Sequence, residues 1–226
     1  MVSLRILLKE AGEIARQSSF LIHSLFNGEE RPFNHSLDLV IGLHGYTARS
    51  FSLYGIGSHL ENSGLNVCLV NYDFWQPNER IAATLQEKLD QLAQKREKKM
   101  SLLGHSQGGL LAIDIAQQRP DLIQKVVALG PPLRGTDTAY LNYPIPSCQE
   151  MIPNNPYCQR LLEGDFPREV LFTSIYTSSD QVIRPWQNAL LPERQGNIKN
   201  IAAPPVGHLG LIGPRCYTLV EKVLKE

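Results

Sequence analysis

LGHSQGG, residues 103–109, is the stretch that decides the fold of this 226-residue chain. An apolar run at 100–103 precedes it and a helical pattern at 110–118 follows, so a strand, a sharp turn and a helix are predicted with Ser106 at the apex. In the pattern G-x-S-x-G, a strained turn lifts a serine hydroxyl out of the end of a parallel sheet. Gly104 and Gly108 are expected there because neighbouring chains approach too closely for a Cβ. The pentapeptide also occurs by chance, so its interpretation depends on partners elsewhere in the chain.

Length and charge bound the class of protein. A chain of 226 residues suits one α/β domain with a sizeable core, so residues 1–226 are predicted to form a single domain. The 22 basic and 22 acidic residues balance, and no long run has a single sign. The composition therefore favours neither nucleic acid nor another polyanion as a partner.

The four cysteines show neither a C-x-x-C motif nor zinc-like spacing, so no metal site is predicted. Cys68 falls inside a predicted strand and is expected in the core. Cys148 and Cys158 share one loop and could pair in an oxidising compartment, but without a visible secretion signal free thiols are favoured.

Residues 1–27 are predicted to form an amphipathic helix, because apolar side chains recur at three- and four-residue steps. Packing of this helix on its own domain is favoured; the alternatives are a dimer contact or attachment of residues 1–26 to a membrane surface. The sequence shows no signal cleavage site and no apolar window long enough to span a bilayer. The cytoplasm is the expected location, with a periplasmic or secreted protein as the alternative.

Strand and helix patterns alternate through the rest of the chain. Strands are predicted at 37–43, 65–72, 100–103, 126–129, 170–176 and 197–202, and helices at 51–62, 78–98, 110–118, 156–163 and 211–225. Seven prolines in residues 131–168 exclude long regular elements there, so this segment is interpreted as a cap-like insertion. The predicted class is α/β: a minimal, mostly parallel sheet of about six strands with helices on both faces, plus an extra N-terminal helix.

Functional loops of such sheets gather at the carboxyl ends of the strands. Ser106, Asp180 and His208 all follow predicted strands, as does the run from His44 to Tyr46. Four separate stretches of sequence are therefore expected to converge on one edge of the sheet.

The residue types at that edge suit nucleophilic catalysis. A serine hydroxyl needs a neighbouring base to take its proton, and His208 lies in a late loop where that base belongs. Asp180 would orient the imidazole and stabilise its charged form. Asp137, inside the proline-rich segment, is the alternative acid.

A developing oxyanion needs two fixed donors, which backbone N–H groups supply without reorganisation. The amide of Gln107, directly after the serine, and that of Tyr46 are the candidates. His44 could support the second loop. The candidate substrate-pocket side chains are His44, Trp75, Leu133, Trp186 and Leu209, although any of the apolar ones could be ordinary core.

Taken together, the motifs resemble the α/β-hydrolases of the lipase and esterase kind, close to small bacterial lipases with minimal sheets. The matching segments cover about residues 37–226: LHGY (43–46), GHSQGG (104–109), VALGPPLRGT (127–136), SIYTSSDQVIRP (174–185) and GHLGL (207–211). Two features depart from the resemblance: no export signal is visible, and the N-terminal helix lies outside the matched region.

The resemblance implies hydrolysis of a small-molecule or lipid ester through Ser106, His208 and Asp180, with an acyl-enzyme intermediate and no cofactor. An acyltransferase or thioesterase would use the same three residues and is the nearest alternative. A non-catalytic binding protein on the same fold is disfavoured because binding would not require all three. The sequence does not predict the oligomeric state.

Overall fold

The computed structural model describes residues 38–193 and 197–226. The helix predicted at 1–27 lies outside these residues. Within them, no helix is both long and apolar enough to cross a membrane.

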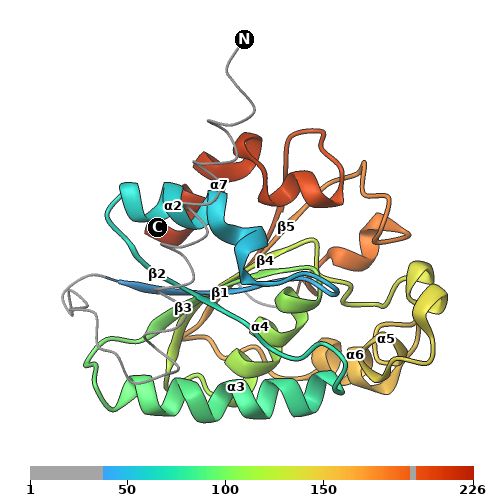
Figure 1. Ribbon diagram of the computed structural model, residues 1–226, viewed down its shortest axis with the longest axis horizontal. Coiled ribbons are helices and arrows are strands. Elements are labelled where there is room, and N and C mark those ends of the chain that lie inside the picture. Colours follow the sequence, from blue (N-terminus) through green and yellow to red (C-terminus); the bar gives the residue numbers. More distant parts are fainter. Residues whose placement is uncertain (1–37, 194–196) are drawn as a thin grey trace, which may run out of the picture.

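A single six-stranded sheet forms the centre of the molecule (Figure 1). All neighbouring strands are parallel, in the order β2-β1-β3-β4-β5-β6. The strands are β1 (Leu39–Leu43), β2 (Asn66–Val70), β3 (Met100–His105), β4 (Ile123–Leu129), β5 (Leu171–Tyr176) and β6 (Ile198–Ala202). The predicted parallel α/β class is confirmed.

Helices cover both faces of the sheet, with α3 and α4 on one face and α2 and α7 on the other (Figure 1). The α-helices are α2 (Tyr54–Asn62), α3 (Asn78–Ala93), α4 (Gln107–Gln118), α5 (Pro146–Gln149), α6 (Pro156–Glu163) and α7 (Pro214–Lys225). Short 3-10 helices lie at η1 (Ser50–Leu53), η2 (Asp137–Asn142), η3 (Trp186–Ala189) and η4 (His208–Ile212). Because both faces are covered, all five residues of β1 are buried, and alternate side chains pack into different core clusters.

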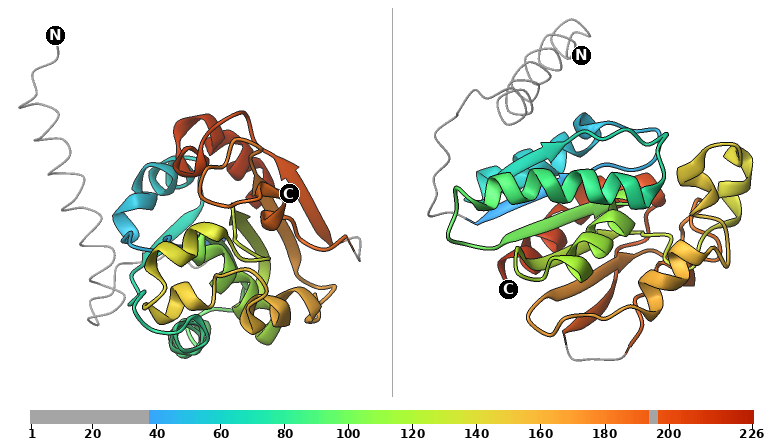
Figure 2. Two further views of the ribbon diagram at one scale, coloured as in Figure 1. Left: turned by 90° about the vertical axis from the view of Figure 1, so that its right-hand side faces the viewer. Right: turned by 90° about the horizontal axis from the view of Figure 1, so that it is seen from below.

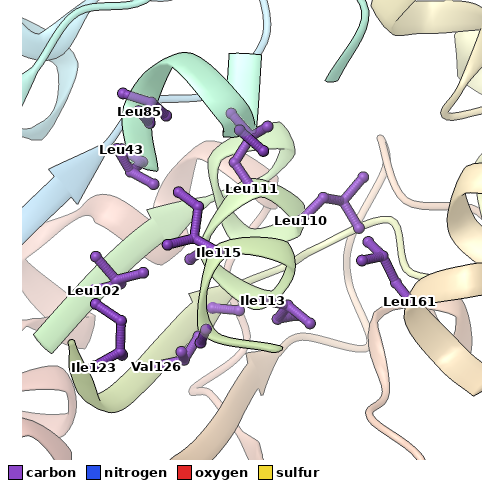
Figure 3. Close-up of a cluster of buried hydrophobic side chains, with 14 of the residues drawn as sticks. Leu43, Leu85, Leu102, Leu110, Leu111, Ile113, Ile115, Ile123, Val126 and Leu161 are labelled. Atoms are coloured by element: carbon purple, nitrogen blue, oxygen red, sulfur yellow. The ribbon is translucent and has the colours of Figure 1, made fainter. Parts of the chain in front are cut away.

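The larger core cluster is built around α4 (Figure 3). Leu110, Leu111 and Ile115 of α4 are fully buried in this cluster, and Leu110 is directed toward Leu161. Leu161 of α6, also fully buried, joins this cluster from the segment between β4 and β5. Part of that segment therefore belongs to the core of the domain.

The segment between β4 and β5 holds more short helices than the sequence predicts. The predicted helix at 156–163 is present as α6, whereas η2 and α5 were not expected. Proline is the first residue of both α5 and α6. The N–H group at this position has no acceptor within the helix, so proline, which lacks that group, loses no hydrogen bond there. In Figure 2 this yellow-to-orange segment extends past the carboxyl ends of the strands, on the side of α3 and α4.

All four cysteines are buried free thiols. Cys68 lies in β2 within the core, as expected. Cys148 and Cys158 are not paired with each other in this structure; Cys158 Sγ instead lies 3.2 Å from the carbonyl of Glu150.

Candidate active site

Ser106 lies at the junction of β3 and α4 in a backbone conformation that residues other than glycine rarely adopt. Its φ of 53° and ψ of −119° lie outside the regions open to most residues, at a cost of about 1 kcal/mol or more. The Ser106 amide donates to the carbonyl of Leu129 on β4 at 2.8 Å, which ties the turn to the neighbouring strand. Strain of this kind persists where the surroundings enforce it, which makes the turn a candidate site.

The glycines around the serine are required by close packing of main chains. A Cβ on Gly104 would lie 2.2 Å from the carbonyl oxygen of Gly108. A Cβ on Gly108 would in turn lie 2.2 Å from the carbonyl oxygen of Leu43 at the end of β1. The start of α4 thus packs directly against the two strands beside it, as the motif predicts.

Asp180 and His208, which are 28 positions apart, meet as a buried pair. His208 Nδ1 lies 2.8 Å from Asp180 Oδ2, and their side chains are 4% and 2% exposed. Asp180 Oδ1 accepts the backbone N–H groups of Val182 and Ile183, each at 2.8 Å. Burial opposes ionisation of Asp180, but the hydrogen bonds from His208 and from these two amides outweigh it and hold the pKa of the carboxyl below its usual value.

The outer nitrogen of His208 is left with no partner among the described residues, although it is buried. With Nδ1 donating to Asp180, Nε2 of the neutral ring is an acceptor and therefore a potential base. The backbone around His208 is held on both sides: its N–H donates to Gln181 Oε1 at 3.1 Å. His105 Nε2 lies 3.2 Å from the His208 carbonyl and donates to it.

His105, the residue before the serine, supports this arrangement. Its ring centroid is 4.7 Å from that of His208. Burial and the neighbouring His208 lower its pKa to about 3, so the ring stays neutral at ordinary pH. The bond from His105 to the His208 backbone carries no recognisable signal in the sequence.

The two candidate oxyanion donors come from different elements. Gln107 is the first residue of α4, so its amide has no intrahelical acceptor. Tyr46 lies in the loop after β1, where its ring packs edge-on against Phe74 at 5.2 Å. His44, fully buried, stacks on Tyr72 at 4.1 Å, and its Nδ1 lies 2.8 Å from the carbonyl oxygen of Gly45. Burial lowers the pKa of His44, which suits a structural ring that supports this loop.

The candidate pocket residues are in different environments. Trp75 and Leu209 are 56% and 69% exposed. Trp186 stacks on Tyr176 at 5.1 Å. Leu133 is fully buried in the core, which favours the alternative that it is a packing residue. A cavity of about 550 Å³ beside the loop after β1 includes Trp75 in its lining, together with Phe74 and Arg49.

The remaining candidates do not join the site. Asp137, the alternative acid, is exposed at the start of η2, whereas Asp180 holds the imidazole. Over residues 38–193 and 197–226, no group of three or more histidine, cysteine or carboxylate side chains could hold a metal ion.

Comparisons with known proteins point to one family. A family profile described as the alpha/beta hydrolase fold matches residues 38–203. Triacylglycerol lipases from Pseudarthrobacter phenanthrenivorans and Burkholderia plantarii are each 37% identical to this chain over 90 residues, which is 38% of the chain. The matched segment spans only 28% and 25% of those two lipases. The solved structure of Aspergillus fumigatus lipase B superposes with a TM-score of 0.73 at 17% identity, over 87% of this chain and 55% of that one.

Proposed function

This chain belongs to the α/β-hydrolase fold family, and we propose that it is a carboxylic ester hydrolase with Ser106 as its nucleophile. The observation that carries the proposal is the buried 2.8 Å bond between His208 and Asp180, because it leaves His208 Nε2 free to act as a base. The partial identity to triacylglycerol lipases supports a lipid or other acyl ester as the substrate class.

In the proposed reaction, the Ser106 hydroxyl attacks the ester carbonyl while His208 Nε2 takes its proton. Asp180 keeps the ring oriented and stabilises the imidazolium that forms. The Gln107 and Tyr46 amides stabilise the negative charge on the carbonyl oxygen. The imidazolium then protonates the leaving alcohol, and a water molecule, deprotonated by His208, releases the acid from the acyl-enzyme.

The experiment is a comparison of ester turnover in the full chain and in Ser106→Ala and His208→Ala. We expect each substitution to reduce kcat by about 10⁴-fold or more, because the nucleophile and its base act as a unit. The substrates are p-nitrophenyl esters from acetate to palmitate, with and without detergent micelles. Thermal unfolding checks that the variants are folded, and a fluorophosphonate probe should label only chains that carry Ser106. Wild-type turnover in Ser106→Ala would contradict the proposal.

The acid is tested by a matched pair in the same assay. Asp180→Asn should lower kcat by about a thousandfold, because the amide favours the wrong imidazole tautomer. Asp137→Asn should stay within about tenfold of wild type, since Asp137 is exposed and the bond to the imidazole is made by Asp180. Reversed magnitudes would assign the acid to the segment between β4 and β5.

A further inference from the structure

Gln107 has a polar side chain that is fully buried, and it is anchored at its far end. Its Nε2 donates to Oδ1 of Asn78 at 2.7 Å. Asn78, also fully buried, is the first residue of α3, just as Gln107 is the first residue of α4. A side-chain bond therefore joins the starts of two adjacent helices, directly beside Ser106.

Asn78 is in turn fixed by the segment between β4 and β5. Its Nδ2 donates to the carbonyl of Ser147 at 3.1 Å. Its backbone N–H donates to the carboxylate of Glu150, and the Ser147 hydroxyl donates to the carbonyl of Phe74. Asn78 thus uses both ends of its amide, so a rotation of this side chain would leave buried polar groups without partners.

This anchoring bears on the backbone of Gln107. Ser106 holds a strained φ of 53° immediately before it, and a strained backbone persists only where the surrounding contacts fix it. The side chain of Gln107, held at Nε2, restrains the residue whose amide is the proposed oxyanion donor. Oxyanion stabilisation depends steeply on donor position, since the donor must lie close to where the charge develops.

We propose that Asn78 is a positioning residue for the oxyanion hole: it holds the Gln107 side chain so that the Gln107 amide points at the developing charge. Ser147 and Glu150 fix Asn78 in this role. The inference rests on the proposed ester hydrolysis. In this proposal, Asn78 of α3 influences kcat although it is distant in sequence from Ser106, Asp180 and His208.

A purely structural role is the competing explanation, and α4 offers a matched control. Gln117 lies near the other end of the same helix, and its Nε2 donates to the carbonyl of Leu161 at 2.9 Å. Gln117→Ala removes a side-chain hydrogen bond from α4 to the same segment, at the opposite end of the helix from Gln107.

The test compares Asn78→Ala with Gln117→Ala in the full chain, using a p-nitrophenyl ester as substrate and an alkyl boronic acid as inhibitor. The boronic acid bonds to the serine oxygen as a tetrahedral anion, so its affinity reports on the oxyanion hole. For Asn78→Ala we expect kcat to fall about ten- to a hundredfold, with KM within about threefold and the boronic acid inhibition constant raised in parallel with the loss of kcat. Gln117→Ala should lower the melting temperature but leave kcat and the inhibition constant within about twofold of wild type.

The outcomes separate this inference from the proposed function. If Ser106 is essential but Asn78→Ala behaves as Gln117→Ala does, the positioning role is wrong and the hydrolase proposal stands. A change in KM alone would also overturn it. Should Asn78→Ala fail to fold, Asn78→Ser keeps a polar residue suited to the start of a helix, yet is too short to reach Gln107. It should show the same loss of kcat and of boronic acid affinity, and wild-type values for both would refute the inference.

Discussion

The segment between β4 and β5 divides into two halves that face opposite environments. In the first half, around η2, Tyr140, Leu141 and Tyr143 are 54%, 83% and 53% exposed. In the second half, from α5 to α6, Cys148 and Leu161 are 1% and 0% exposed. Residues 131–168, which the sequence predicts to be one cap-like insertion, therefore include both an exposed apolar surface around η2 and an extension of the core.

Local interactions explain why the second half is fixed. Asn155 caps α6 by accepting the N–H of Tyr157 at 2.8 Å, and Pro156 occupies its first turn. Arg160 then forms two hydrogen bonds, of 2.9 and 3.0 Å, with Asp114 on α4. The cap and the proline therefore fix the start of α6, and the bidentate ion pair fixes this helix against α4. This difference leads us to expect that substitutions in the second half change stability, whereas those in the first half change substrate use.

The largest difference should appear when the same substitution is made in each half. Leu161→Ala removes a fully buried side chain that packs beside α4, so we expect the free energy of unfolding to fall by about 2–5 kcal/mol. Leu141→Ala, at a position that is 83% exposed, should change it by less than about 0.5 kcal/mol. Urea denaturation of both variants measures the two values. Equal effects would show that the halves are not energetically distinct.

A smaller effect is expected from Arg160→Met. Asp114 is fully buried while Arg160 is 39% exposed, so the substitution leaves a buried carboxylate without its main partner. Gln118 still donates to Asp114 at 2.6 Å, and we therefore expect a loss of about 1–3 kcal/mol, below the full cost of breaking a buried pair. The companion variant Asp114→Asn with Arg160→Met removes both charges. It should recover part of that stability, and a double variant less stable than Arg160→Met would argue against a buried-charge penalty.

The smallest change in stability should come from the apolar surface itself. Replacing Tyr140, Leu141 and Tyr143 together by serine should leave the free energy of unfolding nearly unchanged, because all three are more than half exposed. Hydrolysis of an emulsified long-chain ester should fall several-fold, since exposed apolar patches favour contact with apolar phases. Hydrolysis of soluble p-nitrophenyl acetate should not change. A parallel loss on both substrates would instead place these side chains in the reaction itself.

Much of the fold could be predicted because local patterns and the global arrangement agree. The alternation of apolar runs and helical patterns is sufficient to predict a parallel sheet, and the six strands lie where the apolar runs occur. The start of β4 was missed: the strand begins at Ile123, not 126. Gln124 and Lys125 interrupt the apolar run, yet both side chains find partners, with Lys125 Nζ donating to the carbonyl of Leu224 at 2.7 Å.

Contacts between distant polar side chains could not be predicted. Asn78 and Glu150 are separated by 72 positions, and no periodicity or motif relates them. Which polar groups meet depends on the path of the irregular segment between β4 and β5. The many prolines in this segment argued against regular structure, so the short helices η2 and α5 were not predicted. The burial of the pocket candidate Leu133 in the core could not be predicted either, because a position after a strand indicates the edge of the sheet but not which way the side chain packs.

The contact between Gly108 and β1 is made by main-chain atoms: the nearest neighbours of a Cβ at this position would be the carbonyl oxygens of Leu43 and His44, at 2.2 and 2.5 Å. Any sequence that keeps this glycine and the two strands keeps the depth at which the serine sits. Exposed side chains of the surrounding loops can then be exchanged without moving Ser106. If Ser106 is the nucleophile, as proposed, a library intended to change substrate preference should vary the exposed side chains of these loops and leave Gly108 fixed.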